Sequence, residues 1–157
     1  MQCLKEDFAV TNYFSNPNIH PYKEMIRRLQ TLREYGQKQK YRLIVDKTYN
    51  LEAFLQGCLA AEVRCEHCYY VRMLQTARYA KENGFDCFST TLLVSPFQKH
   101  ELLRQMGERA AQECGIEFYY RDWREGFEQG QQIAKERELY RQGYCGCIFS
   151  ERDRYMK

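Results

Sequence analysis

The chain has 157 residues, 44% of them hydrophobic and 29% charged, which is the length and composition of a single globular domain. It contains no run of about 18 apolar residues, and this excludes a membrane-spanning helix. The net charge of +3 is too small to identify a nucleic-acid-binding protein by itself, although a local basic patch would permit one.

The sequence MQCLKEDFAV lacks the basic-then-apolar pattern of a secretory signal, so we expect a cytoplasmic protein with no membrane partner. The cytoplasm keeps thiols reduced. In that setting the eight cysteines indicate ligands, redox groups or core residues rather than a disulfide framework.

Predicted strands and helices alternate along the chain. Apolar positions such as Met25 and Leu29 recur with the helical period over 22–39. Predicted strands cover 9–14, 41–45, 86–94 and 116–120. Predicted helices cover 22–39, 51–60, 69–84, 97–114 and 126–138. Ser95 and Pro96 are the predicted N-cap and first residue of the fourth helix.

Strands joined by helices of this length predict an α/β fold, with a Rossmann-like parallel sheet and helices on both faces. We expect one such domain over 1–157. Ligands of these sheets bind beyond the carboxyl ends of the strands. The unusual sequence lies there: SNPNIHP follows the first strand, Asp46 the second, SP the third and RDWR the fourth. We therefore expect these loops to converge on one edge.

Two close cysteine pairs carry the strongest chemical signal. In RCEHC, Cys65 and Cys68 stand at a predicted helix start, where the helix N-terminus favours thiolates. In GYCGC, Cys145 and Cys147 point to the same side if the backbone is extended, and Gly146 lets it approach an inorganic group. Four thiolates suit either tetrahedral zinc or an iron–sulfur cluster. Because most of the domain separates the pairs, the spacing favours a centre assembled by the fold.

The other cysteines and the histidines carry weaker signals. Three cysteines lie within helix or strand patterns, where we expect core residues: Cys58, Cys87 and Cys114. Cys3 carries no motif. His67, between the cysteines of CEHC, either supports a metal ligand or lies exposed, and exposure is the simpler interpretation. His100 is expected on a helix surface. His20, in NPNIHP, either supports its loop or contacts substrate.

A basic segment lies in and after the first predicted helix. Its members are Arg27, Arg28, Arg33, Lys38, Lys40 and Arg42. Such a segment either binds phosphates or forms a solvated helix face. Arg72 and Arg124 present the same choice, and a surface salt bridge is the simpler interpretation of each.

Four stretches together resemble the QueH-type epoxyqueuosine reductases. They are YFSNPNIHPYKE, RCEHCYYVRMLQTARYAKENGFDCFSTTLLVSPFQ, YYRDWREG and YRQGYCGCIFS. The resemblance runs from about Tyr13 to Ser150, and the combination of YRQxYCGC, TTLLxSP and NPNIHP is specific.

The resemblance implies the last step of queuosine biosynthesis, in which epoxyqueuosine at the wobble position of tRNA loses its epoxide oxygen. It also implies an oxidoreductase with a [4Fe-4S] cluster, an additional iron and an unidentified electron donor. The matching metal-site cysteines are Cys65, Cys68, Cys145 and Cys147. Asp122, in RDWR, matches an acidic position that can complete the site.

Three residues adjoin the second cysteine pair and are catalytic candidates, for proton delivery or for stacking on a base. They are Tyr140, Arg141 and Tyr144. Deoxygenating an epoxide consumes two electrons and two protons and releases water. No side chain supplies those electrons reversibly, so a redox cofactor must.

Family members begin with a strand that ends in a motif resembling HxCCAPC, and this chain starts after that point. We therefore expect it to be truncated at its N-terminus relative to the family, since Cys3 replaces neither missing cysteine. Three interpretations remain open: a fragment from a misassigned start, a product that no longer works, or a variant that completes its sheet and cluster differently.

Two functions of other classes compete with the reductase. A zinc-stabilised RNA-binding protein without catalysis would also use four thiolates. A thiol–disulfide oxidoreductase would use CEHC alone and leaves the CGC pair without a role.

Overall fold

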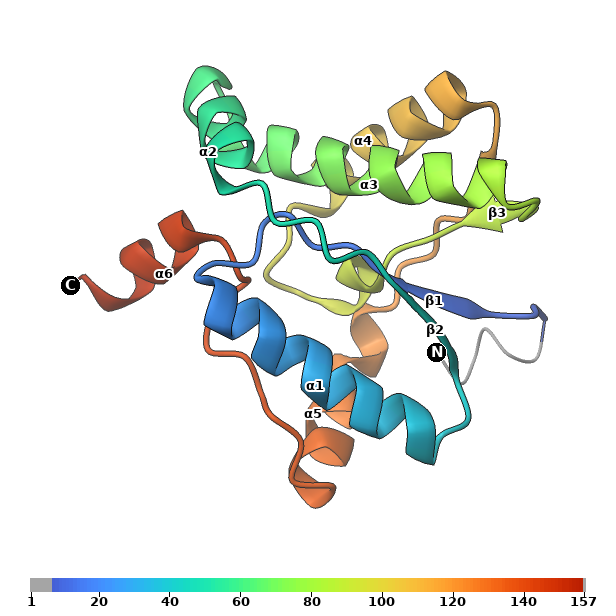
Figure 1. The fold of residues 1–157 in the computed structure, drawn as a ribbon, viewed down its shortest axis with the longest axis vertical. Coiled ribbons are helices and arrows are strands. Elements are labelled where there is room, and N and C mark those ends of the chain that lie inside the picture. Colours follow the sequence, from blue (N-terminus) through green and yellow to red (C-terminus); the bar gives the residue numbers. More distant parts are fainter. Residues whose placement is uncertain (1–6, 157) are drawn as a thin grey trace. The chain divides into compact units, whose positions relative to one another are not determined.

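The computed structural model describes residues 7–156, whose elements form two compact units (Figure 1). The first unit contains residues 7–49 and 142–156, and the second contains Asn50–Arg141. No helix among the described residues is long and apolar enough to cross a membrane.

The first unit is built on a strand–helix–strand crossover. Strands β1 (Thr11–Phe14) and β2 (Arg42–Val45) pair in parallel, and helix α1 (Tyr22–Lys38) connects them. The apolar face of α1 places Met25 and Leu29 in the core, where each is at most 3% exposed. The helical period therefore predicted α1 to within one residue.

Helix α6 (Ile148–Tyr155) completes the first unit, and the sequence pattern did not predict it. It has eight residues, and its N-cap residue, Cys147, makes no side-chain capping hydrogen bond. Neither a capping residue nor a long apolar period therefore marks this helix in the sequence.

The second unit contains the remaining helices and strands. In chain order they are α2 (Leu51–Ala60), α3 (Arg64–Glu82), β3 (Cys87–Phe88), η2 (Thr91–Val94), α4 (His100–Cys114), β4 (Glu117–Phe118), η3 (Arg124–Gly126) and α5 (Phe127–Glu136). Helices α3 and α4 lie side by side, and β3 pairs with β4 in parallel (Figure 1). The core between them includes Met73, Ala77 and Leu103, each at most 1% exposed.

Two predictions around the third strand were wrong. The apolar run predicted as a strand over 86–94 pairs only at Cys87–Phe88, and Thr91–Val94 turns into a 3-10 helix that buries Leu93. Ser95 does not cap α4, which begins five residues later. Its hydroxyl oxygen instead accepts a hydrogen bond from the Phe97 N–H at 3.3 Å, so serine and proline form a turn before the helix.

The mixed α/β class and the parallel pairing are confirmed, but the described strands form two separate two-stranded sheets. The continuous Rossmann-like sheet is not among residues 7–156 and stays a prediction. Each strand–helix–strand crossover nevertheless gives a parallel pair, as the predicted fold requires. In each unit the segments that follow the two paired strands lie together. The Ser15 hydroxyl donates to the Asp46 carboxylate at 3.1 Å, and the Trp123 N–H donates to the Leu93 carbonyl at 3.2 Å.

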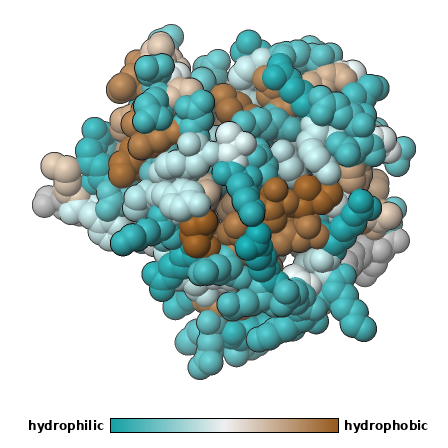
Figure 2. Space-filling view, viewed as in Figure 1, coloured by the Kyte–Doolittle hydropathy of each residue, from teal (hydrophilic) through white to brown (hydrophobic). Residues whose placement is uncertain are grey.

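The surface of the second unit is uneven in polarity. Figure 2 shows hydrophobic atoms over α2, whereas the atoms over α5 are mainly hydrophilic. Helix α2, LEAFLQGCLA, has one charged residue and leaves Leu59 72% exposed. Helix α5 is the opposite case, with charged and glutamine side chains along its length.

Candidate functional site

The NPNIHP loop and the GYCGC segment lie against each other in the first unit. The N–H of His20 donates to the Gly146 carbonyl at 2.8 Å, and the Tyr144 hydroxyl donates to the His20 carbonyl. Two stretches more than 100 residues apart in sequence, both part of the motif combination noted above, therefore form one substructure.

Arg28 ties that substructure to helix α1. Its Nη1 donates to the Cys145 carbonyl and its Nη2 to the Tyr144 carbonyl, both at 3.1 Å. Its Nε pairs with Glu24 at 2.7 Å, and the two side chains are only 10% and 11% exposed. The guanidinium also lies over the Tyr144 ring, 5.3 Å from its centre.

Arg28 was therefore misassigned as a member of a basic phosphate-binding patch or a solvated face. The one sequence signal for its true partner is the i, i+4 spacing of Glu24 and Arg28, which favours an ion pair within a helix. Its bonds to residues 144 and 145 leave no signal in the sequence. Arg27, the next residue, is exposed.

Gly146 is buried, and its backbone is not in the extended conformation considered for the cysteine pair. Its φ is +118°, a conformation that L side chains rarely adopt. A Cβ here would lie 3.0 Å from both the Arg28 Nη1 and the Ile19 Cγ1, and 3.2 Å from the Asn18 Nδ2. The glycine thus lets the backbone lie close to the protein's own side chains. Because the backbone at Gly146 is not extended, the argument that Cys145 and Cys147 point to the same side does not apply.

Asp46 gathers the polar groups at the ends of β1 and β2. Its carboxylate accepts bonds from Ser15 Oγ (3.1 Å), Tyr13 Oη (3.5 Å) and the Thr48 N–H (2.8 Å). Burial of the carboxyl raises its pKa, but these hydrogen bonds together outweigh burial and lower the pKa below 3.8. Two of the four loops predicted to converge thus meet in this unit, while the convergence of all four on one edge stays a prediction.

His20 is a buried member of its loop. It is 1% exposed, and its ring meets the Tyr49 ring edge-on at 5.8 Å. Burial lowers its pKa, against the opposing effect of a hydrogen bond with the Pro17 backbone. Of the two interpretations of His20, loop support is the one that these contacts favour.

Cys65 and Cys68 belong to the second unit, in the first turn of α3, where the sequence predicted a helix start. Cys68 is 8% exposed, and Cys65 packs against the core. His67, between them, is half-buried rather than exposed as expected, and its burial lowers its pKa. Its ring lies so close to α2 that a Cβ on Gly57 would stand 2.1 Å from its Nε2.

Asp122 forms an exposed ion pair with Arg124. The Arg124 Nη2 donates to the Asp122 Oδ2 at 2.5 Å, and the Arg124 Nε and backbone N–H also donate to this carboxylate. These hydrogen bonds lower the pKa of Asp122 to about 2. The surface salt bridge predicted for Arg124 is confirmed, while the metal-site role of Asp122 stays a prediction. Arg141 is exposed.

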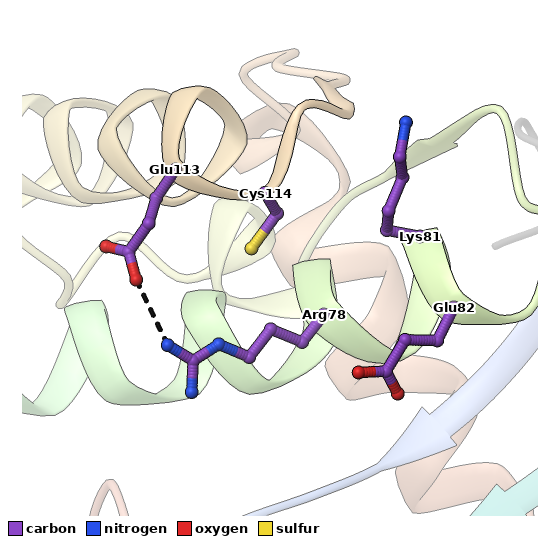
Figure 3. Close-up of a pocket in the computed structure, with 5 residues that line it drawn as sticks. All are labelled: Arg78, Lys81, Glu82, Glu113 and Cys114. Atoms are coloured by element: carbon purple, nitrogen blue, oxygen red, sulfur yellow. Dashed lines mark hydrogen bonds and ion pairs between the residues drawn. The ribbon is translucent and has the colours of Figure 1, made fainter.

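Two shallow cavities open on the second unit. One, of about 250 Å³, is lined by Arg78, Lys81, Glu82, Glu113 and Cys114, with an Arg78–Glu113 ion pair of 3.1 Å across it (Figure 3). It contains none of the predicted site residues, and it leaves Cys114 half-buried rather than in the core. The other, of about 420 Å³, adjoins the first turn of α3 through Glu66 and His67.

The cysteines predicted as ligands form two pairs, one pair in each unit, and none of the four is in a disulfide. Within residues 7–156, no three or more His, Cys, Asp or Glu side chains gather at one point. The donor chemistry nevertheless fits iron or zinc, because thiolates are the preferred ligands of both. Cys3 lies outside the described residues.

Comparison with known proteins gives a consistent result. The family model described as "Epoxyqueuosine reductase QueH" matches residues 1–153. The "Epoxyqueuosine reductase QueH" of Dehalococcoides mccartyi is 38% identical over 154 residues, which cover 98% of this chain and 85% of that protein. The protein with the same description from Thermotoga maritima is 30% identical, and the match covers 92% of this chain and 81% of that protein. The one from Acinetobacter baylyi is 34% identical, and the match covers 94% of this chain and 70% of that protein. The chain belongs to the epoxyqueuosine reductase QueH family.

Proposed function

We propose that this protein is an oxidoreductase that converts epoxyqueuosine to queuosine at the wobble position of tRNA, the last step of queuosine biosynthesis. The observation that carries the proposal is the family match over residues 1–153, with relatives described as epoxyqueuosine reductases at 38%, 34% and 30% identity. The packing of NPNIHP against GYCGC supports it, because two of the motifs that carry the resemblance form one structural element.

The proposed cofactor is a [4Fe-4S] cluster held by Cys65, Cys68, Cys145 and Cys147, with an additional iron as the resemblance implies. Bound there, it would supply the two electrons that epoxide deoxygenation consumes. The overall change is one epoxide, two electrons and two protons giving one alkene and one water. The electrons reach the centre from a separate donor.

The chain's own residues would deliver protons and hold the substrate. Tyr144 and Arg141 flank the second cysteine pair, and we assign them proton delivery or contact with the modified base. The Tyr144 hydroxyl donates to the His20 carbonyl, so its use as a proton donor requires that bond to be exchanged for one to substrate. Asp122 would have to leave Arg124 to reach a metal.

Binding of the tRNA partner requires phosphate contacts. The basic segment remains the candidate surface, with Arg28 removed from it because its guanidinium is already bound. The exposed members are Arg27, Arg33, Lys38, Lys40 and Arg42. Their charges would contribute a salt-dependent part of the affinity.

The deciding experiment measures iron and acid-labile sulfide per chain after reconstitution without oxygen, together with conversion of epoxyqueuosine in tRNA. We expect about four irons and four sulfides for a [4Fe-4S] cluster, and more iron if the additional site fills. Cys145→Ala should lose iron, sulfide and activity together. Cys114→Ala is the matched control, since Cys114 is also a half-buried free thiol but has no predicted ligand role.

Two results would overturn the proposal. One zinc per chain with no sulfide would instead support a zinc-stabilised RNA-binding protein, and chelation should then unfold it. If Cys145→Ala kept its full iron content and activity, Cys145 would not be a ligand and the proposed set of four cysteine ligands would be wrong.

A further inference from the structure

We propose that Arg28 is a positioning residue, which fixes the turn at residues 144–146 so that Cys145 and Cys147 are presented to a metal. This inference rests on the proposed function, because it gives those two thiols a ligand role. Arg28 itself would touch neither metal nor substrate.

Three consecutive backbone carbonyls of the turn are bound by the rest of the first unit. Arg28 donates to the carbonyls of Tyr144 and Cys145, both at 3.1 Å. The His20 N–H donates to the carbonyl of Gly146 at 2.8 Å. The direction of each peptide plane in the turn is therefore set by residues from α1 and from the loop that precedes it.

The geometry of Arg28 is one that only a guanidinium provides. Its Nη1 and Nη2 reach two neighbouring carbonyls while its Nε holds Glu24 at 2.7 Å. A planar, forked donor can make all three bonds at once, whereas a lysine ammonium is a single point charge. Glu24 in turn balances the charge of a side chain that is only 10% exposed.

Gly146 shows how tightly the turn is enclosed. Its φ is +118°, and a Cβ at this position would stand only 3.0 Å from the Arg28 Nη1, so a side chain would fit only if its neighbours shifted. The turn thus packs closely against the side chains of Arg28 and Ile19. A binding site whose backbone is fixed in advance loses less conformational freedom when a ligand binds.

The test uses Arg28→Lys in the full chain, with Arg33→Lys as the matched control. Arg33 lies on the same helix and is exposed, so its substitution leaves the turn untouched. Two quantities are measured on metal-free protein. One is the hydrogen-exchange rate of the His20 amide, which reports on its bond to Gly146. The other is the affinity for cobalt(II), read from its thiolate-to-cobalt absorption.

For Arg28→Lys we expect the His20 amide to exchange at least about tenfold faster and cobalt(II) to bind at least about tenfold more weakly. Arg33→Lys should match the parent chain in both. Faster exchange with unchanged cobalt affinity would mean that Arg28 only stabilises the fold, and it would overturn the proposal. Unchanged exchange, or a parent chain with no thiolate-to-cobalt absorption, would overturn it too.

Tyr144→Phe provides a second variant if Arg28→Lys does not fold. It removes only the hydroxyl that donates to the His20 carbonyl, and we expect smaller changes of both quantities in the same direction. No change in the exchange rate or in the cobalt(II) affinity would contradict the proposal that these contacts fix the turn. If the parent chain binds cobalt(II) through thiolates but assembles no iron–sulfur cluster, the reductase proposal fails while the cobalt and exchange results still decide the role of Arg28.

Discussion

The contact between α4 and β4 depends on Gly107, and replacing this glycine with alanine should destabilise the second unit. A Cβ at Gly107 would lie 2.3 Å from the Phe118 Cε1 and 2.5 Å from two further atoms of that ring. Ordinary contacts of this kind begin at about 3.4 Å. The ring would therefore have to move by roughly 1 Å, although it is packed against Phe88 with ring centres 5.1 Å apart.

Two effects of opposite sign decide the magnitude. Alanine is favoured over glycine inside a helix by about 1 kcal/mol. Overpacking a core typically costs about 1–3 kcal/mol. Because the clash is with an aromatic ring rather than with the end of a flexible chain, we expect overpacking to prevail. A clash of this depth belongs to the upper part of the overpacking range, about 2–3 kcal/mol, so the net loss in the free energy of unfolding should be about 1–2 kcal/mol.

Gly130 provides the matched control, since it also lies inside a helix of the same unit but has nothing within 4 Å of its Cβ position. Gly130→Ala should therefore stabilise by about 0.5–1 kcal/mol. Urea denaturation gives both free energies of unfolding from the shift in midpoint. Adding Phe118→Leu to Gly107→Ala should recover part of the loss. A Gly107→Ala chain as stable as the parent would refute this account of the α4–β4 contact.

Three further predictions concern single side chains. Asn50→Ala removes the side-chain oxygen that caps α2 through the Ala53 N–H at 3.2 Å, and it should lower the free energy of unfolding by about 1 kcal/mol in urea denaturation. The Asp46 carboxyl, with a pKa held below 3.8, stabilises the fold above that pH and loses this contribution as the pH falls through its folded-state pKa. The stability difference between Asp46→Asn and the parent should therefore be largest near neutral pH and shrink with acid, and a constant difference would show that these hydrogen bonds do not favour the ionised form. Arg27→Ala should flatten the dependence of log tRNA affinity on log salt by about one unit if Arg27 contacts a phosphate, whereas an equal slope would assign Arg27 to solvated surface.

Periodic patterns made most of the fold predictable. Helix α1 was predicted because apolar residues recur at helical spacing from Met25 to Tyr35, and Met25 and Leu29 are indeed buried. The apolar run over 86–94 carries no such period, so strand and 3-10 helix could not be told apart from sequence. Packing decided between them, since the turn at Thr91–Val94 buries Leu93 completely.

The candidate site was predictable in its residue types but not in its supports. Paired cysteines are visible in sequence because their spacing is short. The bonds from Arg28 to the Tyr144 and Cys145 carbonyls join residues 116 and 117 positions apart, and backbone acceptors leave no residue signature. The backbone at Gly146 has a positive φ, so the same-side geometry that an extended backbone would give Cys145 and Cys147 could not be predicted from their spacing alone.

The order of segments along the chain has a consequence for synthesis on the ribosome. The second unit is one continuous segment, Asn50–Arg141, whereas the first needs residues 142–156 to join residues 7–49. Segments generally fold as they emerge from the ribosome. The contacts of α1 with residues 142–156 therefore form only after the whole second unit has been synthesised. Translation that stops before residue 142 would leave the Arg28 guanidinium without the Tyr144 and Cys145 carbonyls that it binds in the complete first unit.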